Sequence, residues 1–427
     1  MLQIPFIKAH REVTEQGLTL KKVPNPGTLL DRILEQDEER RDLLTRIEQA
    51  QATLNLKAKA IGTALQQKAQ GEADQLKSEV VDLKEAQAVL QQQLDAVEAD
   101  LHNALLKLPN LPHASVPSGN GPDDNEIVYI SDPDAENLLS GEPHWELAKK
   151  YRLIDFELGV KVTGAGFPVY LGQGAKIQRA LIQYFLDFNT AAGYTEIQPP
   201  ILVNEDSGFG TGQLPDKEGQ MYYIQEDGLY LAPTAEVPVT NLYRDMLLSE
   251  RDLPVLNTAY TPCFRREAGS YGKDVRGLNR LHQFDKVEIV QLVHPDHSYT
   301  VLEQMKEHVA KLVASLGMPF RILLLCGGDM GFASALTYDF EIWSAGQGRW
   351  LEISSVSNFE AFQTNRLKLR FKDSETGKNR LVHSLNGSAL ALPRILAALL
   401  EYYQCPEGII IPKVLQPYMG TDLIKAP

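Results

Sequence analysis

The segment TPCFRREAGSYGKDVRGLNRLHQFDKVEIV, residues 261–290, has a strand-like run at each end and a long connection between them. Successive side chains of a strand point to opposite faces of its sheet. If residues 261–267 and 282–290 form strands that pair antiparallel, one surface gathers a cation, two carboxylates and an aromatic ring. These residues are Arg265, Glu267, Phe284 and Glu288.

Such a surface suits a nucleotide, because a guanidinium pairs with phosphate, a ring stacks on a base and a carboxylate accepts from an amine. The alternative is a surface ladder of cross-strand ion pairs. A connection of about 14 residues is longer than a hairpin requires, which favours a functional role. Its cations Lys273, Arg276 and Arg280 either follow a phosphate backbone or are simply solvated.

The segment LAPTAEVPVTNLYRDML reads as a strand end followed by a helix. In one interpretation Thr234 caps the helix and Glu236 is a favourable charge in its first turn. In the other, both side chains bind an ammonium or hydroxyl group of a ligand. The segment alone does not separate the two.

In NGSALALPRILAALLEYY we expect a tight turn at Gly387, then Ser388, then a helix with Pro393 in its early turns. Arg394 would lie near the positive end of that helix, where a cation is unfavourable unless an anion is close. The anion is either a buried carboxylate or a bound phosphate.

The segment RWLEISSVSNFEAF places Glu352 beside two serines, which indicates a site for a hard cation. A regular strand would put Glu352 and Ser355 on opposite faces, so joint metal binding requires a bulge or bend. We expect His282 to pack or hydrogen-bond near the base of the 261–290 connection. No histidine is placed like the partner of a nucleophile.

The composition is that of an ordinary globular protein, with 427 residues, 43% hydrophobic and 23% charged. Net charge is −14, so a nucleic-acid partner would need a local basic patch. The three cysteines form no CxxC pair, the N-terminus lacks a signal-length apolar core, and no apolar run could span a bilayer. We therefore expect a cytoplasmic protein that does not contact membranes.

Residues 28–108 contain almost no aromatics and no proline. Heptad repeats predict two long helices, joined through QKAQGEAD, that pair as an antiparallel coiled-coil arm about 60 Å long. The alternative is a dimerisation coiled coil. The predicted seam positions are Leu44, Ile47, Leu54, Ala58, Ile61 and Leu65 in the first helix, and Leu76, Val80, Leu83, Leu90, Leu94, Val97, Leu101, Ala104 and Leu108 in the second.

A linker rich in Pro, Gly, Asn and Ser at 109–126 separates the N-terminal domain, 1–108, from a domain at 127–427. The second domain alternates short strand-like runs with long excursions, and it contains neither GxGxxG nor GxxxxGK[ST]. The fold class is therefore α+β, with an antiparallel sheet covered by helices.

Together these segments resemble the bacterial type of the seryl-tRNA synthetase family, which is a class II aminoacyl-tRNA synthetase family. GYTEIQPP looks like motif 1, with Pro200 as a dimer-interface proline. FRREAGSYGKDVRGLNRLHQFDKVE looks like motif 2, and NGSALALPRILAALLE looks like motif 3. The resemblance covers nearly the whole chain, and it makes the arm the part that grips tRNA(Ser).

The resemblance implies a role for each matched residue. Arg265 and Arg394 would be the catalytic cations, on the ATP α-phosphate and γ-phosphate, and Arg265 would also hold the serine carboxylate. Glu352 and Ser355 would hold Mg²⁺. The implied serine-binding residues are Thr234, Ala235, Glu236, Arg265, Glu288 and Ser388. The implied ATP-binding residues are Arg265, Arg266, Glu267, Leu281, His282, Gln283, Phe284, Glu352, Ile353, Ser354, Ser355 and Arg394.

The implied activity is that of a homodimeric serine--tRNA ligase, which forms seryl-adenylate from L-serine and ATP and then charges tRNA(Ser). A selenocysteine tRNA is a further candidate acceptor. One rival is a paralogue that loads a non-tRNA acceptor, against which the intact arm counts. The other is a non-catalytic interaction protein, which would have lost ATP ligands that this sequence retains.

Overall fold

The computed structural model describes residues 1–138, 140–216, 219–267 and 276–426. The predicted loop cation Lys273 lies outside these ranges. The chain divides into two compact units, Met1–Pro109 and Asn110–Pro427. Within the described ranges, no helix combines the length and the apolar character needed to cross a bilayer.

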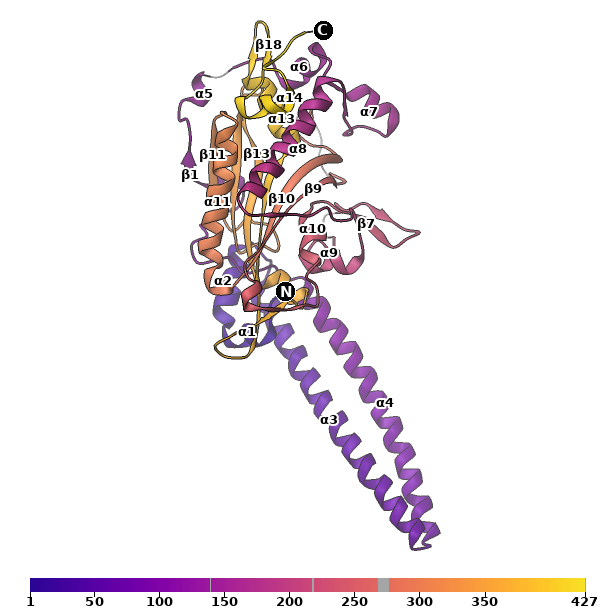
Figure 1. Ribbon diagram of the computed structural model, residues 1–427. Coiled ribbons are helices and arrows are strands. Elements are labelled where there is room, and N and C mark those ends of the chain that lie inside the picture. The colour runs from indigo at the N-terminus through magenta and orange to yellow at the C-terminus, as the bar shows by residue number, and fades with distance from the viewer. Residues whose placement is uncertain (139, 217–218, 268–275, 427) are drawn as a thin grey trace. The chain divides into compact units, whose positions relative to one another are not determined.

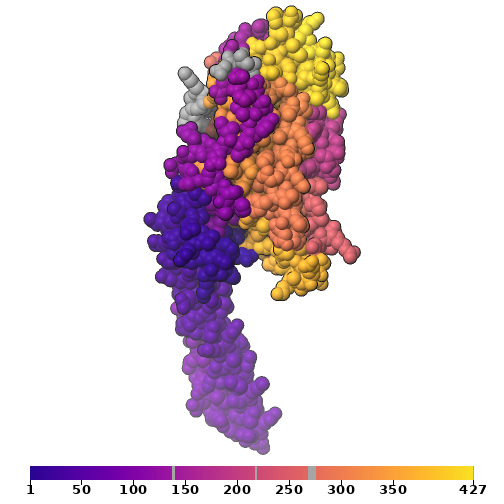
Figure 2. Space-filling view, turned by 90° about the vertical axis from the view of Figure 1, so that its left-hand side faces the viewer, coloured from indigo at the N-terminus to yellow at the C-terminus, as the bar shows by residue number. Residues whose placement is uncertain are grey.

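The first unit is helical. It consists of α1 (Ile4–Ala9), α2 (Arg11–Leu20), α3 (Pro26–Gln66) and α4 (Gln70–Leu106). Helices α3 and α4 pack on each other as a long antiparallel hairpin, drawn as coiled ribbons in Figure 1 and as one narrow rod in Figure 2. The predicted arm is therefore confirmed, although its turn is shorter than QKAQGEAD. Only residues 67–69 separate the helices, and Gly71 lies in the first turn of α4.

The seam of the arm differs from the prediction in α3. Ile47, Leu54 and Ile61 face α4 as expected, but Ala58 and Leu65 are exposed. The second set of seam positions in α3 is instead 43, 50, 57 and 64, which are occupied by Leu43, Ala50, Lys57 and Ala64. The prediction favoured Ala58 over Lys57 and Leu65 over Ala64 because they are more hydrophobic. The observed pairing places Lys57 and Ala64 at the seam. Lys57 is accommodated there because it forms an ion pair with Glu79 of α4.

The second unit is built on an eight-stranded sheet with strand order β1-β11-β12-β13-β16-β10-β9-β4. All neighbours pair antiparallel except β4 and β9, which are parallel. The strands are β1 (Glu126–Ile130), β4 (Thr195–Glu196), β9 (Val255–Phe264), β10 (Gln283–Val293), β11 (Phe320–Leu324), β12 (Leu336–Ser344), β13 (Arg349–Glu360) and β16 (His383–Ala391). The expected α+β class with a mainly antiparallel sheet is confirmed.

Helices surround this sheet (Figure 1). The longest are α8 (Gln173–Ala191), α11 (Ser298–Ser315) and α13 (Leu392–Tyr402), and each packs against strands of the sheet. The shorter ones are α5 (Ala135–Leu138), α6 (His144–Lys150), α7 (Phe156–Val162), α9 (Glu205–Thr211), α10 (Glu236–Asn241), α12 (Phe362–Arg366) and α14 (Gln416–Met419). Helix α8 stops before Gly193, whose φ of +95° suits a glycine.

The two strands of the opening segment pair antiparallel as predicted, but with different ends. Strand β9 ends at Phe264 rather than at residue 267, and Phe284 of β10 lies opposite Cys263. The backbone N–H of Arg265 still donates to the carbonyl of His282 at 3.0 Å, so the chains stay side by side for one more residue. Glu267 has left the ladder and adopts a φ of +47°.

The expected tight turn at Gly387 is wrong, because this residue lies inside strand β16. Gly387 is opposite Val356 of β13 on one side and Ile289 of β10 on the other. A Cβ atom added to Gly387 would lie 3.2 Å from Val356 and 3.3 Å from Ile289. The glycine therefore serves close packing between three strands, which the local sequence cannot reveal.

Small sheets complete the unit. They are formed by β2 (Ile154–Asp155) with β3 (Val169–Tyr170), by β5 (Leu202–Val203), β7 (Leu229–Leu231) and β6 (Tyr223–Ile224), by β8 (Leu247–Ser249), β14 (Arg370–Lys372) and β15 (Asn379–Leu381), and by β17 (Gln404–Cys405), β18 (Gly408–Ile410) and β19 (Leu423–Ile424).

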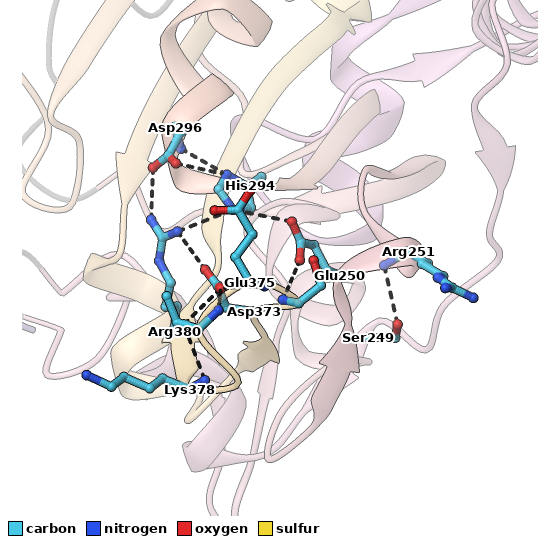
Figure 3. A network of polar contacts seen from close by, with 11 residues as sticks. Ser249, Glu250, Arg251, His294, Asp296, Asp373, Glu375, Lys378 and Arg380 are labelled. Atoms are coloured by element: carbon cyan, nitrogen blue, oxygen red, sulfur yellow. Dashed lines mark hydrogen bonds and ion pairs between the residues drawn. The ribbon is translucent and has the colours of Figure 1, made fainter.

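A polar network braces the small sheet β8–β14–β15 (Figure 3). Arg380 donates to Asp373 at 3.0 Å and to Asp296 at 2.8 Å. Asp373 also accepts from the backbone and hydroxyl of Thr376, and Ser374 N–H donates to Glu250 at 2.7 Å. The network ties the sheet to β10 through the 294–296 turn.

Candidate active site

A cavity of about 1050 Å³ lies along the sheet, between the strand face and the loops that precede α10 and follow β11. It is larger than the usual range for one drug-sized ligand, so it can hold more than one reactant. The predicted site residues that line it are Thr234, Glu236, Arg265, Glu267, Leu281, Phe284, Glu288, Glu352, Ile353, Ser354, Ser355, Ser388 and Arg394.

Four predicted site residues have side chains directed elsewhere. Ala235 is buried in a small apolar cluster under α10. The Arg266 guanidinium lies 6.0 Å from the centre of the Tyr222 ring, pointing away from Arg265 as alternation predicts. His282 hydrogen-bonds the Tyr222 hydroxyl at 2.8 Å and stacks on Phe167, in agreement with its expected packing role. Gln283 is exposed at the start of β10.

One end of the cavity is built around Glu288. Its Oε2 atom accepts from Thr234 Oγ1 at 3.2 Å and from Ser388 Oγ at 3.5 Å, and Lys286 Nζ lies 2.5 Å away. Its Oε1 atom is buried without a hydrogen-bond partner. A buried carboxylate oxygen left unpaired is costly, so this atom is poised to accept from a ligand.

Thr234 bonds to the backbone at the start of α10, although Ala235 is the N-cap residue, and the ligand-binding alternative for Thr234 stays a prediction. Its hydroxyl oxygen accepts from the backbone N–H of Glu236 at 3.2 Å, as a capping residue does, while the hydroxyl donates to Glu288. Glu236 is buried and accepts from Gln363 at 2.6 Å. Burial and the nearby charge of Glu288 raise the pKa of the Glu236 carboxyl to about 7.

The other end of the cavity gathers arginines and one aromatic ring. The Arg265 guanidinium lies 5.3 Å from the centre of the Phe284 ring, and Arg280 lies 3.1 Å from Glu267. Arg394 is at the second position after the start of α13, as predicted. It donates to the carbonyl of Glu352 at 2.7 Å and approaches the carboxylate at 3.4 Å. The anion close to Arg394 in the structure is therefore the carboxylate of Glu352. The guanidinium also borders the cavity, so it could contact a bound phosphate as well.

The bulge required for a joint cation site is present in β13. Glu352 lies opposite Glu341, whereas Ser354 lies opposite Phe340, so Ile353 is the extra residue. The Ser355 hydroxyl donates to Asp339 of β12. Asp339 is half-buried, and desolvation together with the charge of Glu352 holds its pKa well above the ordinary value.

These oxygens fit a divalent cation that is also bound by a ligand. A cation there would offset the repulsion from Glu352 that contributes to the raised pKa of Asp339. Within the described ranges, no set of three His, Cys, Asp or Glu side chains is arranged to hold a metal alone. Mg²⁺ commonly takes one or two carboxylates and completes its shell with water and substrate phosphate, so Glu352, Ser355 and Asp339 fit that pattern.

Among the lining residues without a role in the sequence analysis, three border the predicted ligands. Lys286 lies on the same face of β10 as Phe284 and Glu288, as strand alternation predicts, and lines the cavity. Asn386 was assigned to a turn and instead lines the cavity from β16. Asp339 comes from β12, and no local signal connects it with Glu352, because their proximity depends on the register of β12 with β13.

The sheet topology and this constellation define a class II aminoacyl-tRNA synthetase core. The model of the class II core domain of tRNA synthetases (G, H, P, S and T) matches residues 222–403. The model of the seryl-tRNA synthetase N-terminal domain matches residues 1–112, which include the arm.

Comparisons over the full length identify the family. The chain is 47% identical to a serine--tRNA ligase of Salinibacter ruber, covering all of both chains. It is 45% identical to that of Thermodesulfovibrio yellowstonii, again over both full lengths. A crystal structure of seryl-tRNA synthetase from Pyrococcus horikoshii complexed with ATP superposes with a TM-score of 0.92 at 31% identity, covering all of both chains. The chain belongs to the seryl-tRNA synthetase family.

Proposed function

We propose that this chain is a cytoplasmic, homodimeric serine--tRNA ligase that activates L-serine with ATP and charges tRNA(Ser). The observation that carries the proposal is that one cavity has a carboxylate at one end and cations with an aromatic ring at the other. Glu288 offers an unpaired carboxylate oxygen at one end, and Arg265, Phe284 and Arg394 border the other. An amino acid and a nucleotide fill these two ends with matching charges.

In the first step, a serine carboxylate oxygen attacks the α-phosphorus of ATP in line. A bond forms between that oxygen and phosphorus, the bond to the bridging oxygen breaks, and pyrophosphate leaves. Arg265 neutralises charge on the carboxylate and α-phosphate, and Arg394 does so at the γ-phosphate. Phe284 stacks on the adenine over Leu281, and Glu267 accepts from the adenine amine.

The serine ammonium and hydroxyl are bound by Glu288, Thr234, Glu236 and Ser388. An analogue without the hydroxyl leaves buried acceptors unpaired and is disfavoured strongly, whereas threonine is excluded by shape. Ala235, Arg266, His282 and Gln283 adjoin these ligands in the chain. None of the four lines the cavity, so in this proposal they support the neighbouring residues that contact serine and ATP.

When bound, Mg²⁺ neutralises charge on the ATP phosphates, and Glu352 and Ser355 hold it with Asp339 close by. Ile353 and Ser354 line the same wall of the cavity. In the second step, a hydroxyl oxygen of the tRNA 3′-terminal ribose attacks the acyl carbon, and AMP leaves with the phosphate oxygen.

The arm and the motif 2 loop contact the tRNA in this proposal. A selenocysteine tRNA is a second candidate acceptor. The homodimer rests on the resemblance of GYTEIQPP to motif 1, with Pro200 as its dimer-interface proline.

The test is serine-dependent exchange between ATP and pyrophosphate, followed by charging of a total tRNA pool. We expect exchange with serine and aminoacylation of serine-accepting tRNAs only. Exchange without charging would support a paralogue with another acceptor. A lack of exchange with any amino acid would contradict the proposal and favour a non-catalytic interaction protein.

A further inference from the structure

Helix α6 (His144–Lys150) contacts residues 276–278, where the chain returns from the motif 2 loop to the sheet. Arg276 lies 4.5 Å from the centre of the Trp145 ring and 3.3 Å from Glu146. The backbone N–H of Leu278 donates to His144 Nε2 at 2.9 Å. None of these α6 residues belongs to the predicted site or lines the cavity.

His144 is fully buried and is held by Glu401 of α13, which is also buried. Glu401 Oε1 accepts from the backbone N–H of His144 at 2.9 Å and from its Nδ1 at 2.8 Å. Glu401 Oε2 accepts from Ser344 Oγ and from the N–H of Gly346 at 3.1 Å. These donors keep the carboxylate ionised against the cost of burial, and the pKa of Glu401 is lowered.

This arrangement determines which imidazole nitrogen carries the proton. Since Nε2 accepts from the backbone N–H of Leu278 and Nδ1 faces a carboxylate, the ring carries its proton on Nδ1 and donates it to Glu401. The close approach also explains the neighbouring glycine. Gly277 has a φ of +67°, and a Cβ atom there would lie 2.2 Å from His144 Nε2.

A second path runs from Glu401 to the same return segment. Ser344 accepts from Gln347 Nε2 at 3.0 Å, and Gln347 Oε1 accepts from Asn279 Nδ2 at 2.8 Å. The carbonyl of Asn279 accepts from Arg394 Nε at 3.1 Å. One buried carboxylate is thereby connected to both Leu278 and Asn279, which line the cavity, and through Asn279 to Arg394.

We infer that His144 and Glu401 are positioning residues for ATP: they fix the 278–279 backbone and, through it, Arg394. The inference rests on the proposed function, because it assigns the nucleotide to the Arg394 end of the cavity. It locates a determinant of ATP affinity in α6, outside the segments that resemble motifs 1, 2 and 3. The serine end, around Glu288, is not connected to this network by the bonds described above.

Two amide variants separate positioning from mere packing. Asparagine places its amide near the position of imidazole Nδ1, so His144→Asn keeps a donor for Glu401 and loses the contact with Leu278. Glutamine reaches the position of Nε2, so His144→Gln keeps an acceptor for Leu278 and loses the donor to Glu401. Each variant loses one buried hydrogen bond, so similar losses of stability are expected.

We expect His144→Asn to raise the KM for ATP about fivefold or more, while the KM for serine changes less than twofold. We expect His144→Gln to leave the KM for ATP within about twofold of the original. A matched control is Tyr194→Phe, which removes a buried hydrogen bond of 2.6 Å to Gln291 away from the cavity. Equal effects of the two His144 variants on ATP, or equal effects on ATP and serine, would overturn the inference.

Hydrogen exchange of the 276–281 backbone is a second measurement that needs no activity. His144→Asn should speed exchange of the Leu278 amide, and His144→Gln should not. If the original chain shows no serine-dependent exchange of pyrophosphate, the proposed function fails, and exchange at Leu278 still decides whether His144 holds this segment. Unchanged protection in His144→Asn would refute that role.

Discussion

At the scale of single residues, Glu236 has the clearest consequence for pH. The folded-state pKa of its carboxyl is raised from 4.5 to about 7, chiefly by burial. The folded chain therefore binds this proton more tightly than the unfolded chain. The resulting stabilisation is fully present below about pH 4.5 and is lost as the pH rises through about 7.

Replacing Glu236 with Gln removes this titration. We expect the free energy of unfolding of Glu236→Gln to decline less between pH 4.5 and 7 than that of the original chain, by up to about 3 kcal/mol. Tryptophan fluorescence during urea unfolding measures it, because all three tryptophans, 145, 343 and 350, lie in the second unit. Parallel pH profiles for the two proteins would contradict the raised pKa.

The second prediction at this scale concerns the contribution of Arg394 to ATP binding. Its Nε and Nη1 atoms donate to the carbonyls of Asn279 and Glu352, a forked geometry that lysine cannot reproduce. We expect Arg394→Lys to raise the KM for ATP roughly tenfold and to leave the KM for serine nearly unchanged. The control is Arg370→Lys, an exposed arginine of β14 that does not line the cavity. Equal losses for both substrates would place Arg394 outside the nucleotide site.

At the scale of elements, the observed seam of the arm separates two nearby leucines. Leu54 is 7% exposed and Leu56 is 67% exposed, so only the first packs against α4. We expect Leu54→Ala to destabilise the hairpin by about 2–3 kcal/mol and Leu56→Ala by less than about 0.5 kcal/mol. Hydrogen exchange of the α3 amides measures the arm without a contribution from the other unit. Equal protection in the two variants would show that the seam is assigned wrongly.

The network that braces β8–β14–β15 predicts acid sensitivity (Figure 3). Hydrogen bonds from Thr376 and Arg380 lower the pKa of Asp373, and the bond from Arg380 lowers that of Asp296. Since these folded-state pKa values are depressed, the stabilisation is present above the ordinary carboxyl pKa and is lost as the pH falls. We expect Arg380→Gln to melt at a lower temperature than the original chain at pH 7, with a difference that shrinks below pH 4 and at high salt. Arg370→Gln on β14 is the control, and a difference independent of pH would refute the explanation.

The elements also show what the sequence can and cannot predict. Heptads and strand alternation depend on local periodicity, so they located the arm, the β9–β10 pair and the face that carries Phe284 and Glu288. The bulge at Ile353 was required by the positions of Glu352 and Ser355 and is present. By contrast, Gly387 and His144 owe their roles to partners on other elements that are distant in sequence, which no local pattern specifies.

At the scale of the whole molecule, the division into two units provides a physical basis for separating amino-acid activation from tRNA binding. Among the described residues, the cavity is lined by residues of the second unit, so we expect amino-acid activation not to require the arm. The cross-arm contacts Gln51–Gln87 and Lys57–Glu79 give the register of the hairpin. By that register, residues 44 and 93 lie about opposite each other. A deletion of residues 45–92 closed by a short glycine turn therefore preserves the pairing of what remains.

We expect this deletion to leave the rate of serine-dependent ATP–pyrophosphate exchange within about twofold of the original and to abolish tRNA charging. Without the arm, the tRNA is contacted only near the cavity. Binding is weakened because each phosphate contact that is removed lowers the binding energy. The matched control is Leu56→Ala, which changes one exposed side chain and keeps the hairpin. The measurements are exchange and charging on the same preparations. If charging survives the deletion, the arm is not the tRNA-binding element, and a dimerisation coiled coil becomes the better interpretation, which light scattering of the deletion variant then tests.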